Sequence, residues 1–119
     1  MSPAQKTDLP TLIPMPAQHI SIALDRLFSK DESALLKLGF LPREMDDKWF
    51  IYFENNTLHF HRSWTGVCIY QVFFKQEGDA LRMTQAIVNR NPDQYAETRA
   101  ERDQQIILQV IDIFLLRRE

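Results

Sequence analysis

Residues 59–63 carry the side chains best suited to chemistry, because His59, His61 and Ser63 alternate along the chain. Alternate side chains of a β-strand share one face, so these three would lie together, with Glu54 across a hairpin. Imidazoles and a carboxylate at this spacing could hold a metal ion, and the hydroxyl would allow a hydrolase of the serine, histidine and acid type. The sequence supplies no third strong ligand, and Ser63 ends a strand instead of standing at a sharp turn beside backbone donors. We therefore favour a non-catalytic protein without metal or cofactor, with His59 and His61 as the candidate ligands should a metal bind.

Arg62 points to the opposite face from the histidines, among apolar side chains, where an unpaired charge is costly. The predicted register sets Trp49 opposite Arg62, so the guanidinium would stack on the indole. A carboxylate such as Asp112 or Glu101 would complete this structural pairing. Alternatively, the Arg62 side chain is accessible at the end of the sheet and, together with Trp64–Thr65, binds an anionic or planar group. Arginine would then supply a fork of donors and tryptophan a flat platform.

Residues 48–90 position these side chains, because they read as a four-stranded antiparallel meander. Three turn signals divide the meander, at Asn55-Asn56, at Trp64 to Gly66 and at Glu77-Gly78. The implied pairs are Phe53 with Leu58, Ser63 with Val67, and Gln76 with Asp79. Because side chains alternate, these turns sort the residues into two faces, and a slip of one residue would mix them.

Face one of the predicted sheet is almost entirely apolar and should form the core. It holds Trp49, Ile51, Phe53, Leu58, Phe60, Arg62, Cys68, Tyr70, Val72, Phe74, Leu81, Met83, Gln85 and Ile87. Face two is mixed and carries both histidines. Four of its apolar residues become the favoured protein interface if the helices all pack on face one: Phe50, Tyr52, Ile69 and Phe73.

The segments around the meander complete an α+β fold. Residues 1–16 hold four of the six prolines and are predicted to be a disordered leader, so that the folded domain would span 17–119. Residues 17–28 have apolar side chains at helical spacing, and 29–39 run from a Ser-Lys-Asp-Glu capping box to a glycine, which predicts two N-terminal helices. A second capping box, Thr-Arg-Ala-Glu, opens a long C-terminal helix over 98–116. We expect a four-stranded antiparallel meander with two N-terminal helices and this long C-terminal helix packed on the sheet.

Composition excludes several classes of protein. The chain has 119 residues and a net charge of −2, which suits one domain and argues against general nucleic-acid binding. Its three glycines are all assigned to turns or caps, so no glycine-rich phosphate loop is expected. A single cysteine, no visible signal peptide and no apolar tract of about 20 residues favour a cytoplasmic protein that does not enter a membrane.

Two motifs in the second half of the chain indicate a relationship. The stretch WFIYFENNTLHFHRSWTGVCIY resembles a family of short bacterial proteins that share WF, E and LxFHRSWTGxCIY in this order, followed by VNRxPxQY. The second motif stands here at residues 88–95. The resemblance covers the chain from about Asp47 onward and implies a common fold without indicating an activity. Asn89 and Arg90, at the end of the fourth predicted strand, could converge with the segment around Tyr95 at one rim of the sheet.

Two functions remain open at this point. The favoured one is a non-catalytic binding module whose partner is another protein or a second copy of the chain, and a dimer would then form through face two or the last helix. The alternative is a small-ligand or nucleotide-related module, with hydrolysis as one variant. Its proposed ligand-binding residues are Arg62, Trp64, Thr65, His61, Glu54, Asn89, Arg90 and Tyr95.

Overall fold

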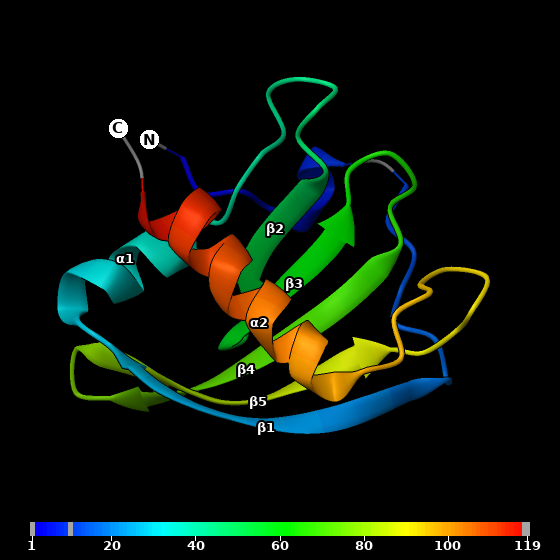
Figure 1. The fold of residues 1–119 in the computed structure, drawn as a ribbon. Coiled ribbons are helices and arrows are strands. Elements are labelled where there is room, and N and C mark those ends of the chain that lie inside the picture. The colour runs from blue at the N-terminus through cyan, green and yellow to red at the C-terminus, as the bar shows by residue number, and fades with distance from the viewer. Residues whose placement is uncertain (1, 10, 118–119) are drawn as a thin grey trace.

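Five antiparallel strands form one sheet in the computed structural model, which describes residues 2–9 and 11–117. The strands are β1 (His19–Phe28), β2 (Trp49–Glu54), β3 (Thr57–Arg62), β4 (Cys68–Glu77) and β5 (Ala80–Asn89), and they lie in the order β1-β5-β4-β3-β2. Helices α1 (Lys30–Leu38) and α2 (Ala100–Val110) cover one face of the sheet (Figure 1). A π-helical turn, Ile111–Leu116, continues α2.

The segment predicted as the first helix is strand β1, so the expectation of four strands and two N-terminal helices is wrong. Three apolar residues of β1 face the core: Ile20, Ile22 and Phe28. They are separated by even numbers of residues, and each lies opposite a core residue of β5. The β-branched isoleucines favour a strand at such positions. The helical interpretation counted Leu27 with Ile20, Ala23, Leu24 and Phe28 on one apolar stripe, but Leu27 faces away from the core and is 49% exposed.

The β2–β3 hairpin has the predicted two-residue turn. Asn55 and Asn56 have φ angles of 55° and 57°, as a turn of this length requires at both positions. The turn places Trp49 opposite Arg62, as predicted. The β4–β5 turn falls one residue later than predicted, at residues 78–79.

A β-bulge at the start of β4 changes the predicted faces there. Phe60 pairs with Tyr70, but the next residue, His61, pairs with Cys68. Ile69 is the extra residue of this bulge and packs into the core. Cys68 therefore shares the face of His61, and its assignment to face one is wrong.

A second bulge lies in β5 at Thr84. Phe73 and Phe74 are neighbours in β4, yet their partners in β5 are two residues apart. Beyond the bulge, Ala86 and Val88 occupy the core positions that alternation had assigned to Gln85 and Ile87.

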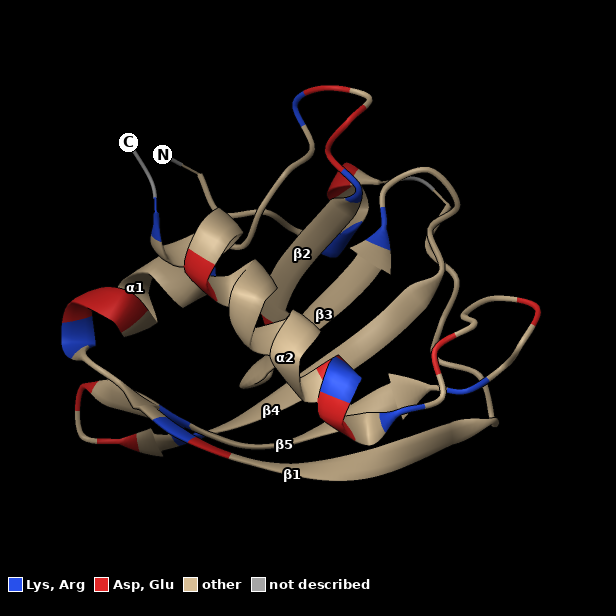
Figure 2. Ribbon diagram, viewed as in Figure 1, with Lys and Arg blue, Asp and Glu red and all other residues tan. Residues whose placement is uncertain are grey.

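The core lies between face one of the sheet and the two helices, while charged residues gather in loops and on the helices (Figure 2). The capping box of α1 is confirmed, because Ser29 Oγ accepts a hydrogen bond from the Glu32 amide (3.1 Å) and Glu32 accepts one from the Ser29 amide (2.9 Å). The capping box predicted at 98–101 is wrong, because α2 begins at Ala100. The Glu97 carboxylate instead accepts hydrogen bonds from two backbone amides just before the helix.

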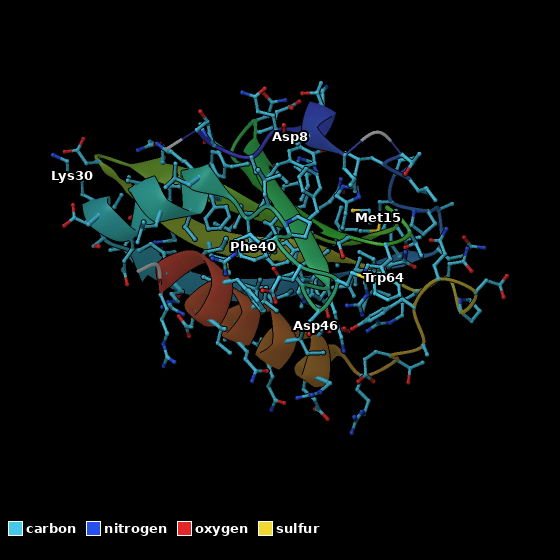
Figure 3. The ribbon with its side chains drawn as sticks, turned by 90° about the horizontal axis from the view of Figure 1, so that it is seen from above. Asp8, Met15, Lys30, Phe40, Asp46 and Trp64 are labelled. Atoms are coloured by element: carbon cyan, nitrogen blue, oxygen red, sulfur yellow. The ribbon has the colours of Figure 1, made fainter. Side chains whose placement is uncertain are left out.

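The N-terminal segment lies on face two, on the opposite side of the sheet from α2, as the position of Asp8 in Figure 3 illustrates. It includes a 3-10 turn, Lys6–Asp8. Its apolar contacts form a small cluster of Ala4, Leu9, Leu12, Phe50 and Tyr52. Gly66 is required where the segment passes, because a Cβ there would lie 1.9 Å from the carbonyl oxygen of Thr11.

The disorder of residues 1–16 in solution and the domain boundary at residue 17 stay predictions; Pro10, one of the prolines of this segment, lies outside the described residues. In the part of the chain that the structure describes, neither helix is long and apolar enough to cross a membrane.

Candidate functional site

A cavity of about 570 Å³ opens at the end of β3. It is lined by Met45, Asp46, Lys48, Arg62, Trp64, Thr65 and Gln94. These residues come from the connection between α1 and β2, the end of β3 with its loop, and the segment after β5. We call this the rim cavity. Of the predicted ligand-binding residues, Arg62, Trp64 and Thr65 line it directly.

Arg62 stacks on Trp49, with the guanidinium carbon 4.4 Å from the ring centroid, which confirms the predicted stacking. The predicted carboxylate partner is wrong: Asp112 pairs with Arg26 of β1 at 3.0 Å. None of the ion pairs within residues 2–9 and 11–117 includes Arg62. The Arg62 guanidinium therefore lies over an aromatic ring, and the half-buried side chain forms part of the wall of the cavity.

The loop that carries Trp64 is tied to the connection before β2. The indole N–H of Trp64 donates to the carbonyl oxygen of Met45 (3.0 Å), and the Ser63 hydroxyl donates to that of Asp47 (2.7 Å). The Asp47 carboxylate in turn accepts hydrogen bonds from the amides of Arg43 and Glu44, which fixes its own loop. Trp64 is nevertheless 72% exposed. Its ring is positioned, yet open to a ligand.

Asn89 organises the third wall of the cavity. Its side chain is fully buried, and its amide donates to the carbonyl oxygen of Cys68 (2.8 Å) and to the side-chain oxygen of Gln94 (2.9 Å). The Asn89 oxygen accepts a hydrogen bond from the Asn91 amide (2.8 Å). Asn89 thus holds a cavity residue, Gln94, against β4.

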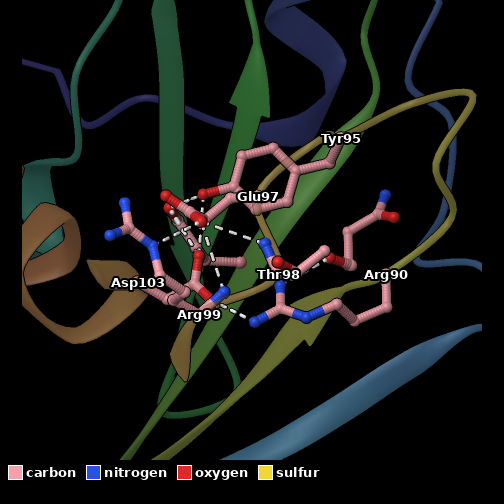
Figure 4. Close-up of polar contacts among 8 residues, drawn as sticks. Arg90, Tyr95, Glu97, Thr98, Arg99 and Asp103 are labelled. Carbon is pink, nitrogen blue, oxygen red and sulfur yellow. Dashed lines mark hydrogen bonds and ion pairs between the residues drawn. The ribbon is translucent and has the colours of Figure 1, made fainter. Parts of the chain in front are cut away.

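A buried polar cluster lies beside this wall, around Asp103 of α2 (Figure 4). The Asp103 carboxylate forms an ion pair with Arg90 and accepts a hydrogen bond from the Tyr95 hydroxyl (2.7 Å). The Tyr95 and Tyr70 hydroxyls lie 2.6 Å apart. Burial raises the pKa of Tyr95 to about 12, while the positive charge of Arg62 acts in the opposite sense. The structure therefore brings Arg90 and Tyr95 together and places Arg62 near enough to act on the cluster.

Asp103 was not identified from the sequence as a residue of the site, although the helix pattern indicates its buried position. It is fully buried and lies four and seven residues before Ile107 and Val110, which are also buried. This spacing puts one carboxylate on the apolar stripe of an amphipathic helix. A charge in that position requires a buried partner.

The predicted histidine site lies on face two, beneath the N-terminal segment. Tyr52 stacks on His59 and on His61, with ring centroids 4.5 and 5.7 Å apart. The Nδ1–H of His61 donates to the carbonyl oxygen of Gly66 (2.8 Å), and burial lowers the pKa of both imidazoles. Glu54 pairs with Lys6 at 3.5 Å.

These contacts separate the groups that a metal site or a hydrolase would need. Within the described ranges, no three side chains of His, Cys, Asp or Glu are grouped to hold a metal ion. The Ser63 hydroxyl donates to a backbone carbonyl at the rim. His61 and Glu54 consequently do not join Arg62 and Trp64 at the cavity.

The four residues of the predicted protein interface are also separated. Phe50 and Tyr52 are buried beneath the N-terminal segment, and Ile69 is buried in the main core. Phe73 alone stays half-buried on face two. A partner would reach Phe50 and Tyr52 only by displacing that segment.

Comparisons of the chain with models of protein families, with curated proteins and with solved structures find no match. The rim cavity and its neighbourhood are therefore the basis for assigning a function. Chemically, this arrangement offers a guanidinium and an ammonium group that form no ion pair with any described residue, an exposed indole, one carboxylate, and amide and hydroxyl groups.

Proposed function

We propose that this protein is a non-catalytic module that binds a small anionic ligand carrying a planar group, and that the ligand occupies the rim cavity. The observation that carries the proposal is Arg62. Its guanidinium lies on Trp49, lines the cavity, and has no ion-pair partner among the described residues. An arginine held in this way presents its remaining donors in a fixed plane, which matches carboxylate or phosphate oxygens.

Lys48 and Trp64 extend this recognition. Lys48 is a second cation of the cavity wall, and it too has no ion-pair partner in the described part of the chain. Trp64 supplies an exposed aromatic surface on which a ring can stack. Asp46 is the acidic residue of the wall and can accept a hydrogen bond from a hydroxyl or amino group of the ligand. Together these groups favour an anion attached to a polar ring system over a bare anion.

Binding is preferred to hydrolysis because the cavity lacks an activated nucleophile. The Ser63 hydroxyl donates a hydrogen bond to the carbonyl oxygen of Asp47, and His59 and His61 lie on face two. Thr65 is the hydroxyl that lines the cavity, and it accepts a hydrogen bond from the amide of Val67 (3.3 Å). No hydrogen bond between the Thr65 hydroxyl and a carboxylate or imidazole is found among the described residues, so this hydroxyl is not activated as a nucleophile.

Adenosine 5′-monophosphate is a suitable probe, because it joins a phosphate to a planar base; inorganic phosphate and adenosine test the two halves separately. Calorimetric titration should show that the nucleotide binds and that Arg62→Gln weakens binding about tenfold or more, since hydrogen bonds to charged groups contribute about 1.5–3 kcal/mol. Arg62→Lys should fall between the two, because it keeps the charge but loses the fork. Trp64→Ala should weaken binding of the nucleotide and of adenosine, but not of phosphate.

Lys75→Gln is the matched control, since Lys75 is an exposed cation of β4 that does not line the cavity. It should leave the affinity unchanged. The proposal is wrong if none of the three probes binds the wild-type protein, or if Arg62→Gln binds the nucleotide as tightly as Lys75→Gln does.

Association with a second copy of the chain is a second candidate function, favoured by the exposed part of face two. Phe73 and Ile87 are half-buried there, and Leu27 is 49% exposed. A dimer through this surface would be detected by light scattering over a range of concentrations, and Phe73→Ser should dissociate it. A protein that stays monomeric at every concentration would exclude this candidate.

A further inference from the structure

A second cavity, of about 640 Å³, lies between the end of α1 and the π-helical turn. It is lined by Ser2, Ala4, Leu38, Gly39, Phe40, Leu41, Arg43, Ile113, Phe114 and Arg117. None of these residues lines the rim cavity. We call it the terminal groove. Its volume lies within the range of roughly 300–1,000 Å³ that is usual for small-molecule sites.

The terminal groove has an apolar floor. The rings of Phe40 and Phe114 meet edge to face, with centroids 5.1 Å apart. Two large apolar side chains that line the groove, Leu41 and Ile113, are each 43% exposed. The groove therefore exposes apolar side chains to water, and an aliphatic chain that covered them would remove this apolar surface from water, which is favourable.

Two arginines line the groove. The Arg43 guanidinium lies over the ring of Phe40, 5.7 Å from its centroid, so it stands directly above the floor. Arg117 lines the groove as well. Neither takes part in an ion pair within residues 2–9 and 11–117, and no Asp or Glu lines the groove. Two positive charges thus border an apolar surface, although the chain as a whole has a net charge of −2.

The backbone holds the groove open in a fixed form. Phe40 exchanges two backbone hydrogen bonds with Ile51 of β2, of 2.8 and 3.0 Å, which anchors the floor to the sheet. Gly39 makes this approach possible, because a Cβ there would lie 2.2 Å from the carbonyl oxygen of Ile51. The opposite wall is the π-helical turn 111–116, a rare conformation that occurs frequently at functional sites.

We propose that the terminal groove binds an aliphatic monocarboxylate of medium chain length. The methylene chain would lie along Phe40, Ile113 and Phe114, and the carboxylate would meet Arg43 and Arg117. The charge selects an anionic end group, while the apolar floor selects a chain and not a second charge. This site is independent of the rim cavity and of the function proposed for it.

Calorimetric titration with decanoate, octanoate and decyltrimethylammonium, each below its micelle concentration, tests the proposal. Decanoate should bind more tightly than octanoate, by up to about fourfold for each added methylene. Decyltrimethylammonium has a similar chain with the opposite charge and should not bind. Arg43→Gln and Arg117→Gln should each weaken decanoate binding, roughly tenfold for a hydrogen-bonded charge pair.

Arg102→Gln is the matched control, since Arg102 is an exposed arginine of α2 that does not line the groove. Arg102→Gln should bind decanoate like the wild type. Arg62→Gln should do so as well, and this result distinguishes the present proposal from the one for the rim cavity. The proposal is overturned if decanoate does not bind, or if decyltrimethylammonium binds equally well. It is also overturned if both Arg43→Gln and Arg117→Gln bind decanoate with wild-type affinity.

Discussion

Replacing Asp103 by alanine should lower the free energy of unfolding by about 3–5 kcal/mol, the range for removing one partner of a buried ion pair. Asp103 is fully buried, and the Arg90 side chain that pairs with it is only 14% exposed. Without the carboxylate, the guanidinium keeps little access to water and has lost its counter-charge. The Tyr95 hydroxyl also loses the acceptor that lies 2.7 Å away. The buried charge dominates this loss, because one neutral hydrogen bond contributes only about 1 kcal/mol.

Asp112 provides the control, because it lies farther along the same helical segment and also pairs with an arginine. Its ion pair with Arg26 is only partly buried, with 31% of the Arg26 side chain and 47% of the Asp112 side chain accessible. Asp112→Ala should therefore cost no more than about 1 kcal/mol. The two substitutions remove the same chemical group, so the difference between them measures the effect of burial.

Urea unfolding followed by tryptophan fluorescence is the assay, since Trp49 stacks on Tyr70 of the Asp103 cluster with centroids 5.7 Å apart. Small domains are stable by only about 5–15 kcal/mol, so the loss expected for Asp103→Ala is a large part of the total stability. Asp103→Asn keeps an oxygen for Tyr95 and should give a smaller, measurable loss. Our interpretation of the cluster is refuted if Asp103→Ala and Asp112→Ala unfold at the same urea concentration.

Further predictions concern face two. Gly66→Ala should destabilise the protein by more than Gly78→Ala. Both glycines have a positive φ, which costs an L-residue about 1–2 kcal/mol. Of the two, Gly66 is the position where the new methyl group would also meet the backbone, 1.9 Å away. Equal urea midpoints for the two variants would show that the N-terminal segment does not lie there. Because burial lowers the pKa of His59 and His61 below 6.5, the unfolded chain takes up protons before the folded protein does. The stability that the two neutral histidines contribute should be fully present above about pH 6.5 and should be lost as the pH falls below it. A urea midpoint that does not decrease between about pH 7.5 and about pH 5.5 would contradict this.

The parts of the fold that depend on local sequence were predictable. Asn55 and Asn56 determine their turn by their own backbone preferences, and one correct turn fixes every pair of the β2–β3 hairpin. The stacking of Arg62 on Trp49 follows from that register. Local turn chemistry was therefore sufficient to predict the placement of Arg62, which lines the rim cavity.

Features that depend on distant pairing were not predictable in the same way. Residues 19–28 fit both a helix and a strand by periodicity, and the strand forms because β5, far along the chain, lies beside it. The bulges at Ile69 and Thr84 carry no glycine or proline signal and reflect how each strand matches its neighbours. Their absence from the prediction reversed the faces of Cys68 and Ile87.

Distant pairing also determines which arginine Asp112 contacts. Asp112 was expected to pair with Arg62, with Glu101 as the other candidate. As part of β1, Arg26 comes within 3.0 Å of Asp112 and takes it as its partner. Arg62 has no ion-pair partner among the described residues, and the proposed function depends on this feature.

The most direct test of that function is a nuclear magnetic resonance titration of the ¹⁵N-labelled protein with adenosine 5′-monophosphate. We expect the indole N–H of Trp64 and the side-chain Nε–H of Arg62 to shift progressively as the nucleotide binds, while the backbone amides of Tyr52 and His59 on face two stay in place. If the nucleotide shifts no signal, or shifts those of face two and leaves Arg62 and Trp64 unchanged, the rim cavity is not its binding site.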